Sequence, residues 1–179
     1  MSVDRIGRIL SCALAGMLFG LSPLRAEMLE FPSADGMKSW PKLPAVSDWH
    51  QDQAASFQNT ANVLIPDGDV YPGAEAVILA KGVARGGGTL TRLIDNDRAA
   101  ASDGTHLEKL ADIADKDARP FTVYAYSPAK SGKWEAVAYG EEGRYFLVFT
   151  LSAQSQASYD KAFPVFAQMI GSYAEMIPW

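Results

Sequence analysis

The feature that most constrains the fold is a pair of apolar segments around a glycine-containing bend in the C-terminal half of the chain. Segments 134–139 and 145–151 are rich in aromatic and branched residues, and 140–144 separates them. Such residues favour strands, and glycines favour the bend of a hairpin. We therefore expect an antiparallel hairpin over 134–151 that forms part of a sheet core.

A segment of helical periodicity follows this hairpin. Its aromatic and aliphatic residues recur at spacings of four, three, four and three, and Ser155 or Ser158 can cap the helix. Because proline removes a helical hydrogen bond, Pro164 predicts either a kink or a main helix that starts there. The apolar stripe predicts that one face of this helix packs on the sheet; it consists of Tyr159, Phe163, Phe166, Ile170 and Tyr173.

Earlier segments predict further strands and one more helix. The apolar runs 62–65 and 76–84 are too short for helices, and the second has so little polar alternation that we expect a central strand. Segment 121–126 is a third expected strand. Helical spacing predicts a helix over 89–101, capped by Thr89 or Thr91, after the glycines of 86–88.

Segment 107–114 permits two interpretations. Residues 105–108 have the form of a helix capping box, and apolar residues follow at helical spacing. However, residues 115–120 are typical of a turn, and the strand at 121–126 requires a nearby partner. We favour an extended segment over 107–114 that forms a hairpin with 121–126.

The prolines of the segment that precedes the body predict little regular structure. Proline removes a backbone donor and restricts the residue before it. We expect an irregular arm over 27–47, with Trp40 anchored on the body, and a single domain over 48–179.

The first 26 residues have the pattern of a secretory signal. Arg5 and Arg8 precede an apolar run over 9–21, which is shorter than the roughly 20 residues of a membrane-spanning helix. A Ser-Pro break and a small residue follow, so we expect cleavage after Ala26 and a periplasmic or secreted protein without an integral membrane span. An uncleaved anchor is the less favoured alternative, and Cys12 lies too close to the start to be a lipoprotein cysteine.

Removal of this segment changes the charge and the cysteine content. It contains three of the 16 basic residues, one of the 21 acidic residues and the only cysteine, which leaves a net charge of −7. An acidic body binds nucleic acids poorly because phosphate requires Lys or Arg. A chain of about 153 residues without disulfides is still long enough for one well-buried core.

No catalytic or metal motif stands out. His50 and His106 are the only histidines, and neither has a paired motif nearby. The aspartates at 95–97 and 112–117 lack the glycine and the glutamate that a calcium loop requires at fixed positions. We therefore interpret them as residues of solvated turns and not as a calcium site. The glycines of 86–88 lack the lysine of a phosphate-binding loop. We therefore assign no catalytic residue, no metal and no cofactor.

Aromatic residues are the remaining candidates for a site. Tyrosine and tryptophan at a rim often mark a binding surface, although strand tyrosines that pack across a sheet are commoner. The candidate ligand- or partner-binding residues are Trp49, Tyr71, Trp134, Tyr139 and Tyr145.

The order of elements implies an α+β fold, an antiparallel sheet with helices packed on it. The hairpin over 134–151, the Thr-Leu-Ser-Ala of 150–153, the Phe-Pro-Val-Phe of 163–166 and the Ile-Gly-Ser-Tyr of 170–173 resemble the C-terminal half of small exported bacterial proteins of the PsbP/Mog1-like group. This resemblance covers roughly 76–173. It implies an α/β/α sandwich in an accessory, assembly or binding role, and it transfers no active-site residue.

Three functions remain open at this stage. The favoured one is an exported, soluble, non-enzymatic accessory or binding protein of the cell envelope, with an envelope protein or a small ligand as its partner. A small periplasmic hydrolase that uses carboxylates and a histidine is the first alternative, and it requires a pocket in which a histidine and an aspartate converge. A self-associating envelope structural protein is the second.

Overall fold

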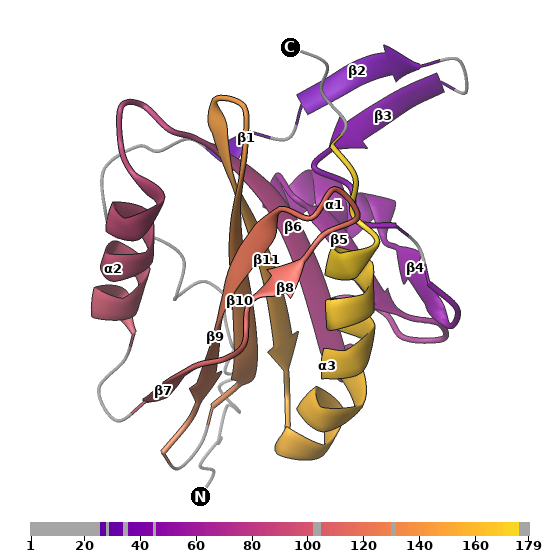
Figure 1. Ribbon diagram of the computed structural model, residues 1–179. Coiled ribbons are helices and arrows are strands. Elements are labelled where there is room, and N and C mark those ends of the chain that lie inside the picture. The colour runs from indigo at the N-terminus through magenta and orange to yellow at the C-terminus, as the bar shows by residue number, and fades with distance from the viewer. Residues whose placement is uncertain are drawn as a thin grey trace, which may run out of the picture.

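The computed structural model describes residues 26–27, 29–33, 36–44, 46–101, 105–129 and 132–175. Its main feature is an antiparallel sheet, nine-stranded within these residues, in the order β4-β5-β6-β11-β10-β9-β7, with β1 on β6 and β8 on β9 (Figure 1). The strands are β1 (Ala26–Glu27), β4 (Trp49–Gln51), β5 (Asn62–Pro66), β6 (Ala76–Ala84), β7 (His106–Lys109), β8 (Ile113–Ala114), β9 (Pro120–Ser127), β10 (Trp134–Glu142) and β11 (Tyr145–Ala153).

The predicted hairpin is the central pair of this sheet. β10 and β11 pair over their full length, from Trp134 opposite Ala153 to Glu142 opposite Tyr145. β6 then pairs with the other edge of β11 and is itself central, as its nearly continuous apolar sequence predicted. The α+β fold class is therefore confirmed, with an antiparallel sheet as the core.

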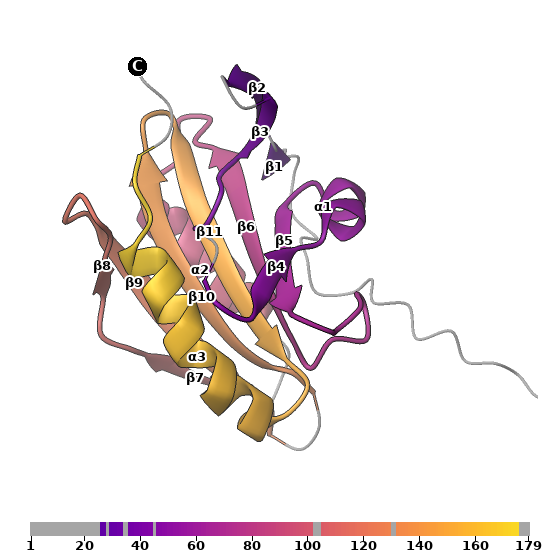
Figure 2. The same ribbon diagram turned by 90° about the vertical axis from the view of Figure 1, so that its right-hand side faces the viewer.

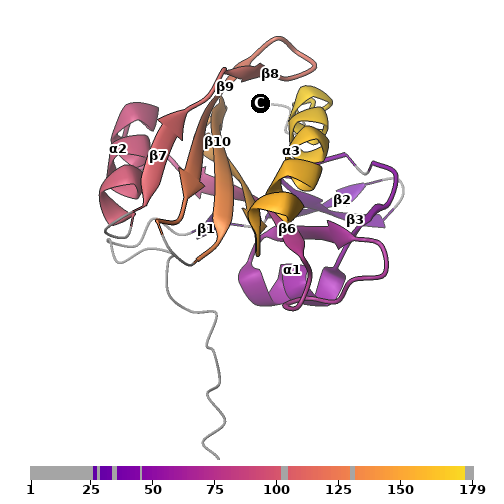
Figure 3. The same cartoon turned by 90° about the horizontal axis from the view of Figure 1, so that it is seen from below.

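Helices cover both faces of the sheet (Figures 2 and 3). α1 (Gln53–Asn59) and α2 (Leu90–Ala100) lie on one face, where α2 buries Leu93 and Ile94 against β6, β10 and β11. α3 (Gln156–Gly171) lies on the other face, where Phe166 and Ile170 are fully buried. The three layers are those of an α/β/α sandwich.

The final helix does not start at Pro164, which was one of the two expectations for this proline. Ser155 caps α3 by accepting a hydrogen bond from the backbone N–H of Ser158, so the helix starts well before Pro164 and runs through it. Proline has no backbone N–H, so the carbonyl of Asp160, four residues earlier, receives no helical hydrogen bond. Both Asp160 and Pro164 are exposed. Water can therefore solvate the free carbonyl, which makes an interior proline tolerable here.

The extended interpretation of 107–114 is confirmed. β7 pairs with β9 from His106 opposite Ser127 to Lys109 opposite Tyr124, and β8 continues along the same strand. Asp115 fixes the turn that follows, because its buried carboxylate accepts the backbone N–H groups of Asp117 and Arg119, each at 2.9 Å. The turn at 115–120 therefore determines the structure of this segment, and the capping-box pattern at 105–108 does not start a helix.

The N-terminal arm is more regular than expected. β2 (Leu29–Ser33) and β3 (Gly36–Trp40) form a two-stranded antiparallel sheet, with Pro32 opposite Met37. The expectation of an irregular arm is therefore wrong for these residues. A two-stranded ribbon has two edges, and a proline on an edge strand need not donate to the ladder, so prolines alone did not exclude strands.

The predicted anchor at Trp40 is confirmed. Its indole is fully buried against Tyr145, with ring centroids 4.9 Å apart, and its Nε1 donates a 3.0 Å hydrogen bond to Oε1 of the buried Glu142. The Tyr173 hydroxyl donates to Oε2 of the same carboxyl group at 2.6 Å. Because Gly82 in β6 has no side chain, the indole can lie directly on the strand. Glu142 thus joins the arm and the segment that follows α3 to β10.

Within the described residues, no helix is both long enough and apolar enough to cross a membrane.

Candidate functional site

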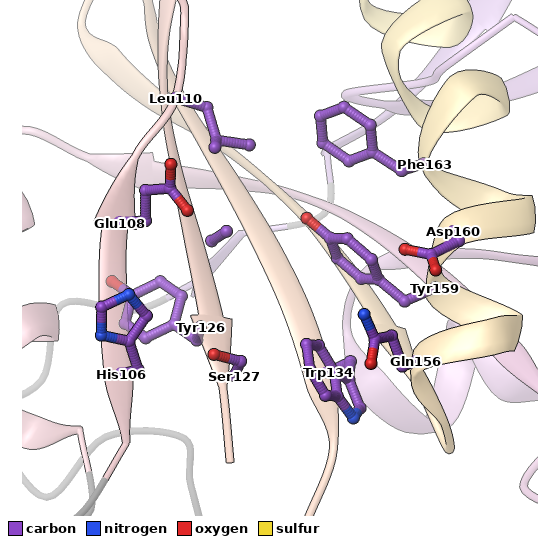
Figure 4. A pocket seen from close by; sticks show the side chains of 11 residues that line it. His106, Glu108, Leu110, Tyr126, Ser127, Trp134, Gln156, Tyr159, Asp160 and Phe163 are labelled. Carbon is purple, nitrogen blue, oxygen red and sulfur yellow. The ribbon is translucent and has the colours of Figure 1, made fainter. Parts of the chain in front are cut away.

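A groove runs along the sheet face that carries α3, between that helix and β7 (Figure 4). Its volume is about 340 Å³. One wall comes from β7 and the other from α3, while β9 and the start of β10 form the floor. The lining residues are His106, Glu108, Leu110, Ala125, Tyr126, Ser127, Trp134, Gln156, Tyr159, Asp160 and Phe163.

Strand alternation sets the β7 wall. His106, Glu108 and Leu110 lie two residues apart, so their side chains share one face of the sheet. His106 and Glu108 pair with Ser127 and Ala125 of β9, and the N–H of Leu110 donates to the carbonyl of Val123 at 2.9 Å. The register therefore places this wall beside the floor.

The helical period sets the α3 wall. Tyr159 and Phe163 are four residues apart on α3, and their rings stack at 5.6 Å between centroids. Trp134, at the start of β10, lies 6.3 Å from the Tyr159 ring at a tilt of 48°. Three aromatic rings thus form a continuous surface along one side of the groove (Figure 4).

A small side chain keeps the floor low. Ala125 lies in β9 directly opposite Ala136 of β10, and neither methyl group reaches far from the sheet. A larger residue at 125 would fill the space between β7 and α3.

The groove carries negative charge. Glu108 lies on the β7 wall and Asp160 on the α3 wall, with the Tyr159 ring between them (Figure 4). Burial raises the pKa of Tyr159 to about 12, and the charges of Asp160 and Glu108 add to this effect. No Lys or Arg is among the lining residues. The lining thus disfavours anions.

The five aromatic residues predicted from the sequence do not gather in one place. Trp134 lines the groove, but Trp49 is largely buried in the main core. Tyr145 is buried against Trp40. The Tyr71 hydroxyl donates to Oδ1 of Asn59 at the end of α1, at 3.2 Å, and neither Tyr71 nor Tyr145 lines the groove.

Tyr139 lies on the opposite face of the sheet, under α2. Its hydroxyl donates to Oδ2 of Asp97 at 3.1 Å, and burial raises the pKa of both groups. The Tyr126 hydroxyl is also buried, and it lies close enough to Tyr139 to contribute to the raised pKa of that group. Tyr139 therefore has a packing role between β10 and α2.

The two histidines differ in their surroundings. His50 Nδ1 lies 2.8 Å from Oδ1 of Asp67, but both side chains are about half exposed and neither lines the groove. His106 lines the groove on the wall opposite Asp160 (Figure 4). Among the described residues, no group of three or more His, Cys, Asp or Glu side chains could hold a metal ion.

Sequence reasoning missed most of the groove. His106 has no paired motif in the sequence, which favours a surface or structural histidine, and Tyr159 and Phe163 belong to the helix stripe that is predicted to pack on the sheet. The available signal was the combination of a two-residue period at 106, 108 and 110 with a helical period at 156, 159, 160 and 163. Only the strand order shows that these two sets face each other.

Comparisons with known proteins address the fold alone. No family model matches the chain, and no curated protein matches its sequence. Among solved structures, the chain is similar to PA94 from Pseudomonas aeruginosa, a protein of unknown function that is described as a candidate regulator. The TM-score is 0.49, and the identity is 12% over 85% of this chain and 99% of that one. The chain is also similar to cyanobacterial PsbP from Synechocystis, with a TM-score of 0.44 and 13% identity over 74% of this chain and 95% of that one. A PsbP is thus among the solved structures to which the chain is similar.

Proposed function

We propose that this chain is an exported, non-enzymatic accessory or binding protein of the cell envelope, and that it holds its ligand or partner in the groove between β7 and α3. The observation that carries the binding role is the continuous aromatic surface of Trp134, Tyr159 and Phe163 beside a small-residue floor. Concave sites lined by aromatic rings with a few polar groups are typical of ligand binding.

Export rests on the N-terminal sequence. Residues 1–25 lie outside the described residues, and their basic start, apolar run and Ser-Pro break support a cleaved signal. Cell fractionation with mass determination of the purified protein tests this. A mature form that begins at Glu27 in the envelope fraction supports export, and an uncleaved cytoplasmic chain refutes it.

The binding role is tested by capture from envelope extract with Trp134→Ala. The exposed Phe57, on α1 at the other face, offers the matched control Phe57→Ala. We expect the wild type and Phe57→Ala to retain the same bound protein or small molecule, identified by mass spectrometry, and Trp134→Ala to lose it. Retention by a folded Trp134→Ala variant would refute the groove as the binding site.

The hydrolase alternative lacks a supporting arrangement. His106 lines the groove together with Glu108 and Asp160, but no hydrogen bond or ion pair joins it to either carboxylate. Among the described residues, the histidine and aspartate in hydrogen-bond contact are His50 and Asp67, which are exposed and lie outside the groove. General acid–base catalysis requires the pair to reach a bound substrate, so this contact does not favour an enzyme.

A further inference from the structure

We propose that the groove selects a small organic cation, an ammonium group on an aliphatic stem. This inference rests on the proposed binding role and names the chemistry of its ligand. The arrangement of charge, aromatic rings and volume within the groove supports it.

The charge comes from the two walls. Glu108 and Asp160 face the groove from opposite sides, and no hydrogen bond or ion pair joins either carboxylate to another described residue. His106 is the other ionisable group of the β7 wall, and the lining contains no Lys or Arg. An ammonium group between the walls would therefore approach two carboxylates and meet no fixed cation.

The aromatic rings complement a cation in a second way. The faces of Trp and Tyr rings carry negative charge density and attract cations within about 6 Å of the ring centroid. Trp134 and Tyr159 lie 6.3 Å apart at a tilt, so one ammonium group can contact both rings. Leu110 and Phe163, at the other end of the groove, offer an apolar surface for the aliphatic stem (Figure 4).

The volume favours a small molecule over a protein segment. A cavity of about 340 Å³ lies at the lower end of the range of roughly 300–1,000 Å³ typical of small-molecule sites. The groove is bounded by α3 on one side and by β7 on the other, which limits a bulky extended chain.

Titration with three probes of similar length tests the selectivity: 1-aminopentane, pentan-1-ol and hexanoate. The indole N–H signal of Trp134, assigned by its loss in Trp134→Phe, reports binding by NMR. We expect 1-aminopentane to shift this signal saturably, pentan-1-ol to bind at least tenfold more weakly, and hexanoate to bind least.

Two variants test whether the exposed carboxylates of the two walls contribute to cation binding. Glu108→Gln and Asp160→Asn should each weaken 1-aminopentane binding by about two- to fivefold, the range expected of one exposed ion pair. Glu75→Gln and Asp95→Asn, which remove exposed carboxylates outside the groove, should leave binding unchanged. Raised salt should weaken binding of the amine and not of the alcohol.

The outcomes separate this inference from the proposed function. Equal binding of 1-aminopentane and pentan-1-ol, or unchanged binding in the two wall variants, would overturn the cation and leave the groove as a binding site. A groove that binds none of the probes, in a protein whose Trp134→Ala variant still loses its captured partner, would also overturn the cation alone. A blocked Gly-Lys-Gly peptide that binds more than tenfold more tightly than 1-aminopentane would identify a protein segment and overturn the small-molecule assignment.

Discussion

Replacement of Gly82 by alanine should destabilise the protein through the indole of Trp40. A Cβ atom at position 82 would lie 2.7 Å from Cη2 of that indole, closer than real Cβ atoms approach. Trp40 is fully buried, so the ring cannot move into solvent without leaving the core. The indole must shift, and its hydrogen bond to Glu142 shifts with it.

The expected magnitude has three parts. Overpacking of a filled core costs about 1–3 kcal/mol. Disruption of a buried hydrogen bond costs about 1–3 kcal/mol more. Alanine reduces the freedom of the unfolded chain, which offsets about 0.4–1 kcal/mol. The free energy of unfolding should therefore fall by about 1–6 kcal/mol, a large share of the roughly 5–15 kcal/mol typical of a domain.

Urea unfolding followed by circular dichroism measures this change. Gly73→Ala is the matched control, because its Cβ would meet only the carbonyl oxygen of Val70 at 3.5 Å. Its free energy of unfolding should rise by about 0.4–1 kcal/mol, the effect of alanine on the unfolded chain alone. In a Trp40→Leu background, Gly82→Ala should have an effect like that of Gly73→Ala, because the indole is gone. An equal cost in both backgrounds, or a Gly82→Ala variant as stable as the wild type, would refute the reasoning.

Further predictions concern the turn, the helix and the groove. Asp115→Asn should lower the unfolding free energy by about 1–3 kcal/mol, whereas Asp117→Asn, at a half-exposed ion pair, should change it by less than about 1 kcal/mol; urea unfolding decides. Pro164→Ala should raise it by about 1–2 kcal/mol, and a loss would contradict a continuous α3. In alkaline titration, Tyr159→Phe should remove a tyrosinate signal at pH about 12. Since the fold favours the protonated phenol, the stability that Tyr159 contributes is complete below pH about 10 and declines as the pH rises towards 12, so Tyr159→Phe should lose less stability in that interval.

The sheet and the closing helix could be predicted because local chemistry and tertiary packing agree there. The aromatic and branched residues of β10 and β11 favour strands wherever they occur, and burial on the α3 face reinforces this preference. Thr89 and Ser155 cap helices whose apolar residues already have the helical period.

The arm could not be predicted in the same way, because its structure depends on distant partners. Trp40 is held by Glu142, 102 residues away in the sequence, and lies on a glycine in a third segment. Nothing near Trp40 in the sequence indicates either contact. β4 and α1 escaped prediction for a related reason: seven residues of α1 are too few to show a clear helical period.

The position of the groove follows from the widths of a helix and a sheet. A helix is about 10–12 Å across and neighbouring strands are about 4.8 Å apart, so one helix covers about two strands. On the α3 face, Trp40, Leu43 and Trp49 pack in the same core as α3, whereas β9 and β7 continue the sheet beyond β10. No described helix therefore covers β9 on this face, and the side chain of Ala125 is too small to fill the space above the strand. The sequence predicts a closing helix that packs on the sheet, but the strand order decides which strip of the sheet this helix leaves open, and with it which residues face a ligand.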